Sequence, residues 1–170
     1  MKKIINHIER PFFLIVLFFL FQFVSTVGKI DRYTLPSYFV SYSHGWGVRR
    51  FLGTVIETIF PNYVSGIGLW VFVSLFTFLL ILLFSRFLSR VYHAACEDGT
   101  KISAIFLILL ISVSPFSVAY LFPGANYGRM ELYLLILVFS YIAIDGLWTN
   151  LWRKRLVMYV FMIMGCLVHQ

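Results

Sequence analysis

Long apolar runs bounded by basic residues dominate the hydrophobic pattern along this chain. A helix needs about 20 apolar residues to cross the hydrocarbon core of a bilayer. The pattern therefore predicts an all-α integral membrane protein with four to five transmembrane helices. Pro115 is expected to kink the third of these, and Pro123 is expected to end it. The expected spans are residues 11–28, 67–85, 102–122, 131–148 and 156–170.

The first and last runs each allow two interpretations. The run 11–28 is longer than the apolar part of a typical signal peptide, and no small-residue cleavage motif follows it. We therefore interpret it as an uncleaved first span. The run 156–170 is short for a full crossing. It is either a marginal helix or the point at which a longer protein is interrupted, which would make the chain an N-terminal fragment.

The loop between the first two spans, residues 29–66, is rich in aromatic residues, which is not typical of disorder. Its second half, 48–60, places apolar residues at the i, i+3, i+4, i+7 spacing of one helix face. Arg50 and Glu57 project from the opposite, polar side. We therefore expect an amphipathic helix over 48–60 that lies in the outer membrane interface.

The composition agrees with a membrane protein and excludes several other classes. Hydrophobic residues make up 61% of the chain and charged residues only 12%, whereas a soluble domain carries about 25% charged residues. This balance excludes a disordered tail and an ordinary cytosolic enzyme. Cys96 and Cys166 are far apart and show no metal or redox spacing, so a disulfide scaffold is excluded as well. No phosphate-binding loop, hydrolase elbow or zinc-protease motif occurs.

The distribution of basic residues predicts the orientation of the chain. There are 14 Lys and Arg against 7 Asp and Glu, a formal charge of +7. Cytoplasmic loops of membrane proteins collect Lys and Arg. With the N-terminus in the cytoplasm, the inner segments hold most of these residues, so we expect this orientation and no nucleic-acid partner. The basic residues that remain on the outer side are Lys29, Arg32, Arg49, Arg50 and Arg129.

A candidate anion site lies just before and at the start of the amphipathic helix. Gly45 and Gly47 permit tight turns, His44 precedes them, and Arg49 and Arg50 follow. Exposed amides, the positive end of a helix and two guanidinium groups together favour a phosphate. The alternative is that the arginines only anchor anionic lipid headgroups. Because basic pairs are disfavoured on the outer side, a functional role is favoured.

Carboxylates on the outer side are candidates for chemistry. Asp31 follows the first span and could act as a base or hold a metal ion, although an exposed lone Asp is more often inert. Arg129 and Glu131 stand where the fourth span enters the membrane, where charges are costly and often functional. The alternative for Arg129 is that its side chain only reaches back to the interface.

The segment 38–53, with Gly45 and the Arg49-Arg50 pair, together with Gly128-Arg129-x-Glu131, resembles a group of bacterial polytopic membrane proteins of surface-polysaccharide settings. More distantly, the layout is similar to the GT-C type of glycosyltransferase. Such enzymes carry an acidic residue in the first outer loop beside an interfacial amphipathic helix, and they use polyprenyl-phosphate-linked sugars. They sit in the bacterial inner membrane.

The resemblance implies roles for particular residues of this chain. Asp31 would be the base, and Arg49, Arg50 and Arg129 would hold the lipid phosphate. The chain departs from the pattern in two respects. Asp31 has no acidic neighbour of the kind that many of these enzymes show, and four or five spans are fewer than is usual for the family.

Two functions of different classes follow from these observations. The first is an extracytoplasmic site for a lipid phosphate, used for glycosyl transfer from a polyprenyl-phosphate-linked sugar in surface-polysaccharide assembly. The alternative is a non-catalytic membrane subunit with protein partners in the membrane. Membrane lipid is an expected partner in both, and the cofactor stays open. The catalytic candidates are Asp31 and Glu131, and the ligand-binding candidates are Arg49, Arg50, Arg129, His44 and Glu57.

Overall fold

The computed structural model describes residues 2–30, 35–39, 51–60, 66–114, 117–122, 126–129, 131–145 and 151–169. Within these residues every regular element is an α-helix or a 3₁₀ helix, and no strand forms, which confirms the all-α expectation. In chain order, the elements are α1 (Lys2–Thr26), η1 (Leu35–Tyr38), α2 (Phe51–Ile59), α3 (Gly66–Glu97), α4 (Lys101–Val113), η3 (Val118–Leu121), α5 (Glu131–Asp145) and α6 (Leu151–His169).

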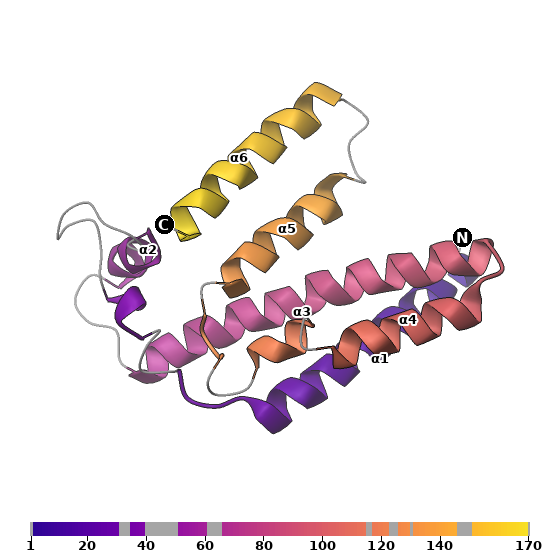
Figure 1. The fold of residues 1–170 in the computed structure, drawn as a ribbon, viewed down its shortest axis with the longest axis horizontal. Helices are drawn as coiled ribbons and strands as arrows, with labels where there is room; N and C mark the ends of the chain where they lie inside the picture. The colour runs from indigo at the N-terminus through magenta and orange to yellow at the C-terminus, as the bar shows by residue number, and fades with distance from the viewer. Residues whose placement is uncertain are drawn as a thin grey trace.

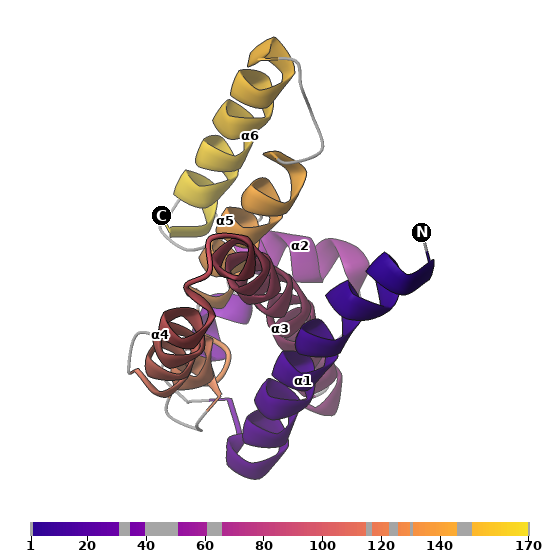
Figure 2. The same cartoon turned by 90° about the vertical axis from the view of Figure 1, so that its right-hand side faces the viewer.

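The central element is α3, against which α1, α4 and α5 all pack. Figure 2 shows these three helices arranged around it, with α6 on the far side of α5. An aromatic series crosses the middle of the bundle. Phe84 of α3 meets Phe19 of α1 at 5.3 Å between ring centroids and Phe139 of α5 at 5.1 Å, both edge to face. This geometry is favourable for aromatic rings, so one side chain ties three helices together.

One helix among the described residues, α3, is long and apolar enough to cross a membrane. Its apolar part, 66–85, is about 30 Å long, which matches the thickness of the hydrocarbon core. Shorter apolar helical stretches cover Pro11–Thr26, Lys101–Ser112 and Glu131–Ile144. The structure thus identifies α3 as a membrane-crossing candidate by length and composition.

The helix expected over 102–122 is divided in two. The first part, α4, ends at Val113, and Ser114 takes the extended conformation, with φ −61° and ψ 145°. Ser114 precedes Pro115, and the residue before a proline is disfavoured in the helical region. The chain resumes as η3, where the Ser117 side chain accepts a hydrogen bond from the Ala119 amide. The expectation of one kinked helix was therefore wrong, because the proline ends α4.

The end of α3 also differs from the end of its apolar run, because the helix continues into the charged residues that follow. The expected second span ended near residue 85, but α3 continues to Glu97. Arg90 in this extension donates hydrogen bonds to the carbonyl oxygens of Ile142 at 3.2 Å and Ala143 at 3.5 Å. These carbonyls belong to the last turn of α5, where a helix has no internal donors for them. The basic side chain therefore caps a neighbouring helix end, which apolar periodicity does not reveal.

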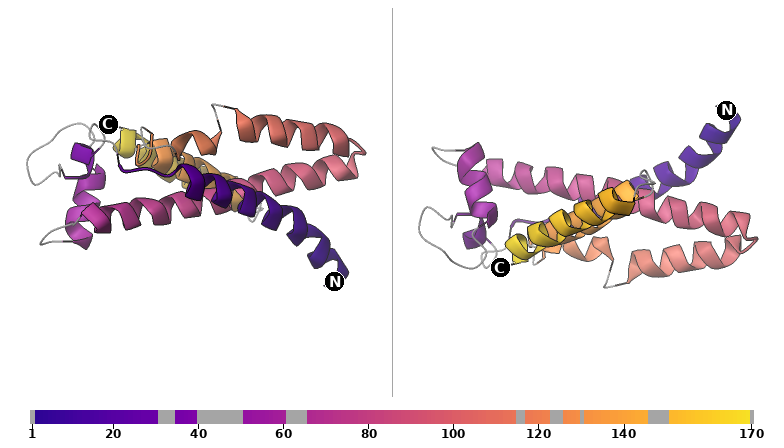
Figure 3. Two further views of the ribbon diagram at one scale, coloured as in Figure 1. Left: turned by 90° about the horizontal axis from the view of Figure 1, so that it is seen from below. Right: turned by 90° about the horizontal axis from the view of Figure 1, so that it is seen from above.

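The segments gather at two ends of the molecule. The exit from α1, η1, α2, the start of α3 and the end of α6 lie at one end, which we call the loop end (Figure 1). The N-terminus and the turn between α3 and α4 lie at the opposite end (Figure 3). At the loop end, α2 packs against η1 and α6. Leu52 and Ile56 of α2 are buried, and Glu57 is exposed.

Candidate functional site

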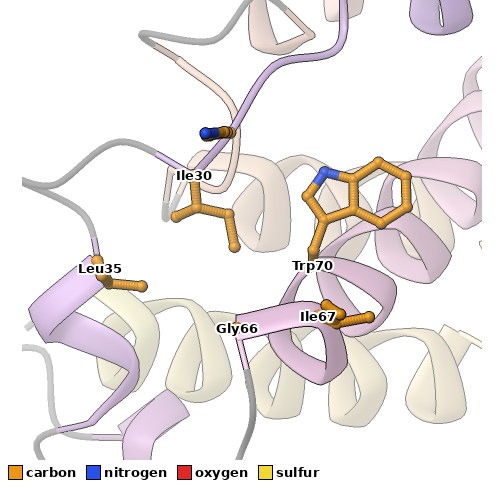
Figure 4. Close-up of a pocket in the computed structure, with 6 residues that line it drawn as sticks. Ile30, Leu35, Gly66, Ile67 and Trp70 are labelled. Carbon is orange, nitrogen blue, oxygen red and sulfur yellow. The ribbon is translucent and has the colours of Figure 1, made fainter.

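The loop end contains an open cavity of about 420 Å³. This volume falls in the range of small-molecule sites, about 300–1,000 Å³. Figure 4 shows Ile30 and Trp70 facing each other across it, with Leu35 to one side and the first turn of α3 below. The lining is almost wholly apolar, and Lys29 is its one charged residue. The lining residues are Lys29, Ile30, Leu35, Gly66, Ile67 and Trp70.

The cavity forms where the chain leaves α1 and where α3 begins. The indole N–H of Trp70 donates to the carbonyl oxygen of Gly28 at 3.2 Å, which holds the first turns of α3 against the segment that follows α1. Ile67 remains 79% exposed and Trp70 37% exposed. Exposed apolar side chains favour contact with an apolar ligand or with lipid chains, because their contact with water is unfavourable.

One wall of the cavity is secured by a buried tyrosine pair. The hydroxyl of Tyr38 donates to the carbonyl oxygen of Gly128. The hydroxyl of Tyr133, in the first turn of α5, donates in turn to the Tyr38 oxygen at 3.2 Å. Tyr38 is almost fully buried, and burial raises the pKa of its phenol well above the usual value. The phenol is therefore a neutral donor at physiological pH.

A second tyrosine anchors the same region to α3. The hydroxyls of Tyr127 and Ser74 lie 2.6 Å apart, and the Tyr127 ring packs against Trp70 and Phe23. Burial raises the pKa of Tyr127 as well, and the Ser74 hydrogen bond opposes that rise. The turn 126–129 is thus attached to η1 through Gly128 and to α3 through Tyr127.

Gly128 occupies a position that only glycine fits well. Its φ is +83°, a region that residues with a side chain rarely adopt. A Cβ atom there would lie 3.2 Å from Cγ2 of Ile30 and 3.4 Å from the Tyr38 hydroxyl. The turn therefore touches the cavity wall directly, through the residue that precedes Arg129.

Arg129 and Glu131, two of the residues singled out from the sequence, are brought together. Their Nη2 and Oε1 atoms form an ion pair at 3.2 Å, and Arg129 Nη1 also donates to Asn126 Oδ1 at 3.1 Å. Both charged side chains are largely exposed, at 39% and 52%. Such exposed pairs stabilise a fold by at most about 1 kcal/mol. Glu131 also stands in the first turn of α5, where the helix dipole favours a negative charge.

The other expected site residues divide into two groups. Glu57 is exposed on α2, as its place on the polar face predicted, and it takes part in an interaction with another residue. The remaining four lie outside the described residues: Asp31, His44, Arg49 and Arg50. The start of the expected amphipathic helix, 48–50, lies outside them too, and α2 covers 51–59 of it.

Sequence reasoning missed the part of the site that the structure shows most clearly. In the sequence, Lys29 counted only as one of the outer basic residues, and Trp70 only as part of the span expected over 67–85. The signal available was weak, because five of the six lining residues are apolar or glycine and resemble any other core residue. Within the described residues, no group of three His, Cys, Asp or Glu side chains could hold a metal ion.

The arrangement favours a ligand with two chemical parts. An apolar chain fits the Ile30, Ile67 and Trp70 surfaces, and an anionic group suits the charge of Lys29, which also lines the cavity. Comparison with protein-family models, with curated proteins and with solved structures finds no match to this chain.

Proposed function

We propose that the protein is a multi-span membrane protein that binds a phosphate-bearing lipid at its loop end, on the extracytoplasmic side. The observation that carries the proposal is the open apolar cavity of about 420 Å³ with Lys29 at its lining. A lipid presents an alkyl or isoprenoid chain next to a negative headgroup, and the cavity offers matching surfaces to both parts. Arg129 is a further candidate cation, because it follows Gly128, which packs on Ile30, although its guanidinium is paired with Glu131.

The position of the cavity supports a lipid in preference to a soluble metabolite. Ile67 and Trp70 belong to the first turns of α3, the helix that is able to cross a membrane. They therefore stand where a membrane span meets the interface, and Trp is enriched at that level. A lipid would reach this cavity from the side without crossing water.

The gathering of segments at two ends supports several crossings with a cytoplasmic N-terminus. The segments expected outside meet at the loop end, and the turn between α3 and α4, which Lys101 follows, lies at the opposite end with the N-terminus. Cys96, close to that turn, is exposed. A variant with Cys96 as the sole cysteine should resist impermeant maleimide in intact cells. A cysteine-free variant carrying Lys29→Cys should label. The reverse pattern would contradict the orientation and the outer site.

Binding is tested with Trp70 as the reporter, in a variant whose other three tryptophans are phenylalanine. The protein is placed in vesicles that contain brominated phosphatidic acid or brominated phosphatidylcholine with the same chains. We expect the phosphatidic acid to quench Trp70 several-fold more effectively at equal content. Lys29→Gln should remove this preference, whereas Lys101→Gln, an exposed lysine near the opposite end, should keep it. Equal quenching by the two lipids would contradict the proposal.

The narrower form of the proposal is glycosyl transfer from a polyprenyl-phosphate-linked sugar, with Asp31 as the base and Glu131 as a second candidate. It rests on the sequence resemblance and on the suitability of the cavity for such a lipid. The test is the yield of surface glycan in cells that carry Asp31→Asn at the normal protein level. Loss of glycan with lipid binding retained would support catalysis. Normal glycan with lipid binding retained would favour a non-catalytic lipid-binding subunit.

A further inference from the structure

Leu35 and Tyr38 lie on the same short element, η1, but face different surroundings. Leu35 lines the cavity, and Tyr38 is buried and bonded to the turn before α5. Because η1 is a single 3₁₀ turn, a displacement of its backbone would move both residues together. The position of one cavity wall is therefore coupled to the Tyr38 hydroxyl.

Gly128 also contacts the second part of the cavity wall. Gly128, whose carbonyl accepts the Tyr38 hydrogen, also packs against Ile30 so closely that a Cβ atom would meet Ile30 Cγ2 at 3.2 Å. Ile30 is a second wall residue of the cavity. Gly128 is thus linked to both parts of the wall. It packs against Ile30 directly, and it is linked to Leu35 through Tyr38, which lies on the same short helix.

We propose that Tyr38 and Gly128 form a latch that positions the cavity wall made by the side chains of Ile30 and Leu35, and so sets the width of the lipid cavity. This inference rests on the proposed function for the nature of the ligand. Tyr38 and Gly128 are positioning residues that need not touch the lipid. Tyr133 completes the latch, since its hydroxyl donates to Tyr38 and directs the Tyr38 hydrogen toward Gly128.

The latch depends on one hydroxyl group. In Tyr38→Phe the ring still fills its buried site, but the Gly128 carbonyl loses its donor and the Tyr133 hydroxyl loses its acceptor. Unpaired buried polar groups are unfavourable and seek water or other partners. The wall that carries Leu35 should then leave its position for a larger fraction of the time.

The experiment measures wall movement without any lipid. Leu35→Cys is introduced into a Cys96→Ser, Cys166→Ser protein in detergent, and its rate of maleimide labelling is recorded. Tyr38→Phe should raise this rate about tenfold, the change expected for one lost buried hydrogen bond. Tyr120→Phe is the control, because it removes the same hydroxyl group from an exposed side chain of η3. It should leave the rate within about twofold, well below the tenfold change.

A general loss of structure is separated from a local one by a distant probe. In the same Cys96→Ser, Cys166→Ser background, Ser89→Cys places a thiol at a buried position of α3, and Tyr38→Phe should leave its labelling rate unchanged. Gly128→Ala is the second variant, and it should raise the Leu35→Cys rate by displacing Ile30 and Tyr38. Unchanged labelling at position 35 in both latch variants would overturn the inference, as would equal acceleration at positions 35 and 89.

The lipid readout separates the latch from the proposed function. With the latch released, the preference of Trp70 quenching for brominated phosphatidic acid should fall several-fold, and restoring Tyr38 should restore it. If the wall responds in the labelling assay but the wild-type protein shows no lipid preference, the latch stands and the lipid site fails. If the lipid preference is present and survives Tyr38→Phe, the latch does not position the site and the inference fails.

Discussion

The carbonyl oxygen of Gly128 accepts the hydroxyl hydrogen of Tyr38, a residue 90 positions earlier in the chain. This bond joins the segment that follows α1 to the turn that precedes α5. The Tyr133 hydroxyl donates a second hydrogen bond to the Tyr38 oxygen. The rings of the two tyrosines also pack edge to face, with 6.4 Å between their centroids. Three parts of the chain thus meet at the loop end, beside the cavity.

The first prediction concerns the backbone of Gly128. Gly128→Ala should lower the free energy of unfolding by more than Gly99→Ala. Both glycines have positive φ, +83° and +73°, so both substitutions carry a strain of about 1–2 kcal/mol. Nothing lies within 4 Å of a Cβ at Gly99, whereas one at Gly128 meets Ile30 and Tyr38. Denaturation in detergent micelles measures the difference, and equal losses would show that the contact is unimportant.

The second prediction concerns Arg90. Arg90→Met should destabilise the protein by about 1–2 kcal/mol, because the last carbonyls of α5 lose a charged donor. Arg86→Met, at an exposed position one turn earlier on α3, is the control and should change stability little. Hydrogen exchange should quicken at the end of α5 in the first variant. If exchange there is unaltered, the cap contributes nothing to α5.

The third prediction concerns the aromatic series at the centre of the bundle. Phe84→Ala should cost about 3–5 kcal/mol, because it leaves a cavity against both Phe19 and Phe139. Phe78→Ala removes the same side chain from an exposed position on the same helix and should cost far less. Thermal unfolding in one detergent compares the two variants. Similar losses would mean that Phe84 does not hold α1 and α5 to α3.

The fourth prediction is a loss of stability in alkali. Tyr38 and Tyr127 have pKa values raised above the ordinary 10.0 by burial. Below pH 10 the phenols are neutral in both the folded and the unfolded state, so their contribution is fully present. Above it the unfolded state ionises first, and each phenol lowers stability by up to about 1.4 kcal/mol per pH unit.

Unfolding free energies measured across this pH range test that sign. Tyr127→Phe should make the alkaline decline shallower, since one buried phenol is removed. Tyr120→Phe, at an exposed tyrosine of η3, is the matched control and should leave the decline as it is. A decline of the same steepness in both variants would mean that Tyr127 is not protected from ionisation in the fold.

The fifth prediction concerns the Arg129–Glu131 pair. If Arg129 contacts the lipid phosphate, Glu131 competes for it through the 3.2 Å ion pair. Glu131→Gln should therefore strengthen the binding of phosphatidic acid vesicles, by up to about fivefold for a pair of this exposure. Arg129→Gln should weaken binding, and the double variant should resemble Arg129→Gln. Weaker binding in Glu131→Gln would point instead to a positioning role for the carboxylate.

Much of the helical framework follows from local pattern. The apolar runs place the middle parts of α1, α3, α5 and α6, because helices that meet lipid or a bundle core must be apolar over several turns. Local pattern fails at helix ends. The break after Val113 depends on how Ser114 accommodates the following proline, and the contact of Arg90 with the end of α5 joins residues that are more than 50 positions apart.

The candidate site was only partly accessible to the same reasoning. Arg129 and Glu131 are two positions apart, so their pairing lies within reach of local argument. The cavity is different, since Lys29, Ile30 and Leu35 line it together with Gly66, Ile67 and Trp70, and no local pattern joins these two groups. Nothing in such a pattern indicates that Trp70 bonds to Gly28.

The sequence by itself determined the all-helical class, the apolar length of α3 and the charges that border it, because these depend on residues within a few turns of each other. The tertiary structure alone decided that Tyr38 meets Gly128 and that Lys29 shares a cavity with Trp70. Such contacts join distant parts of the chain. They form only where helix packing brings the segments together and compensates for the entropy lost in closing the loops between them.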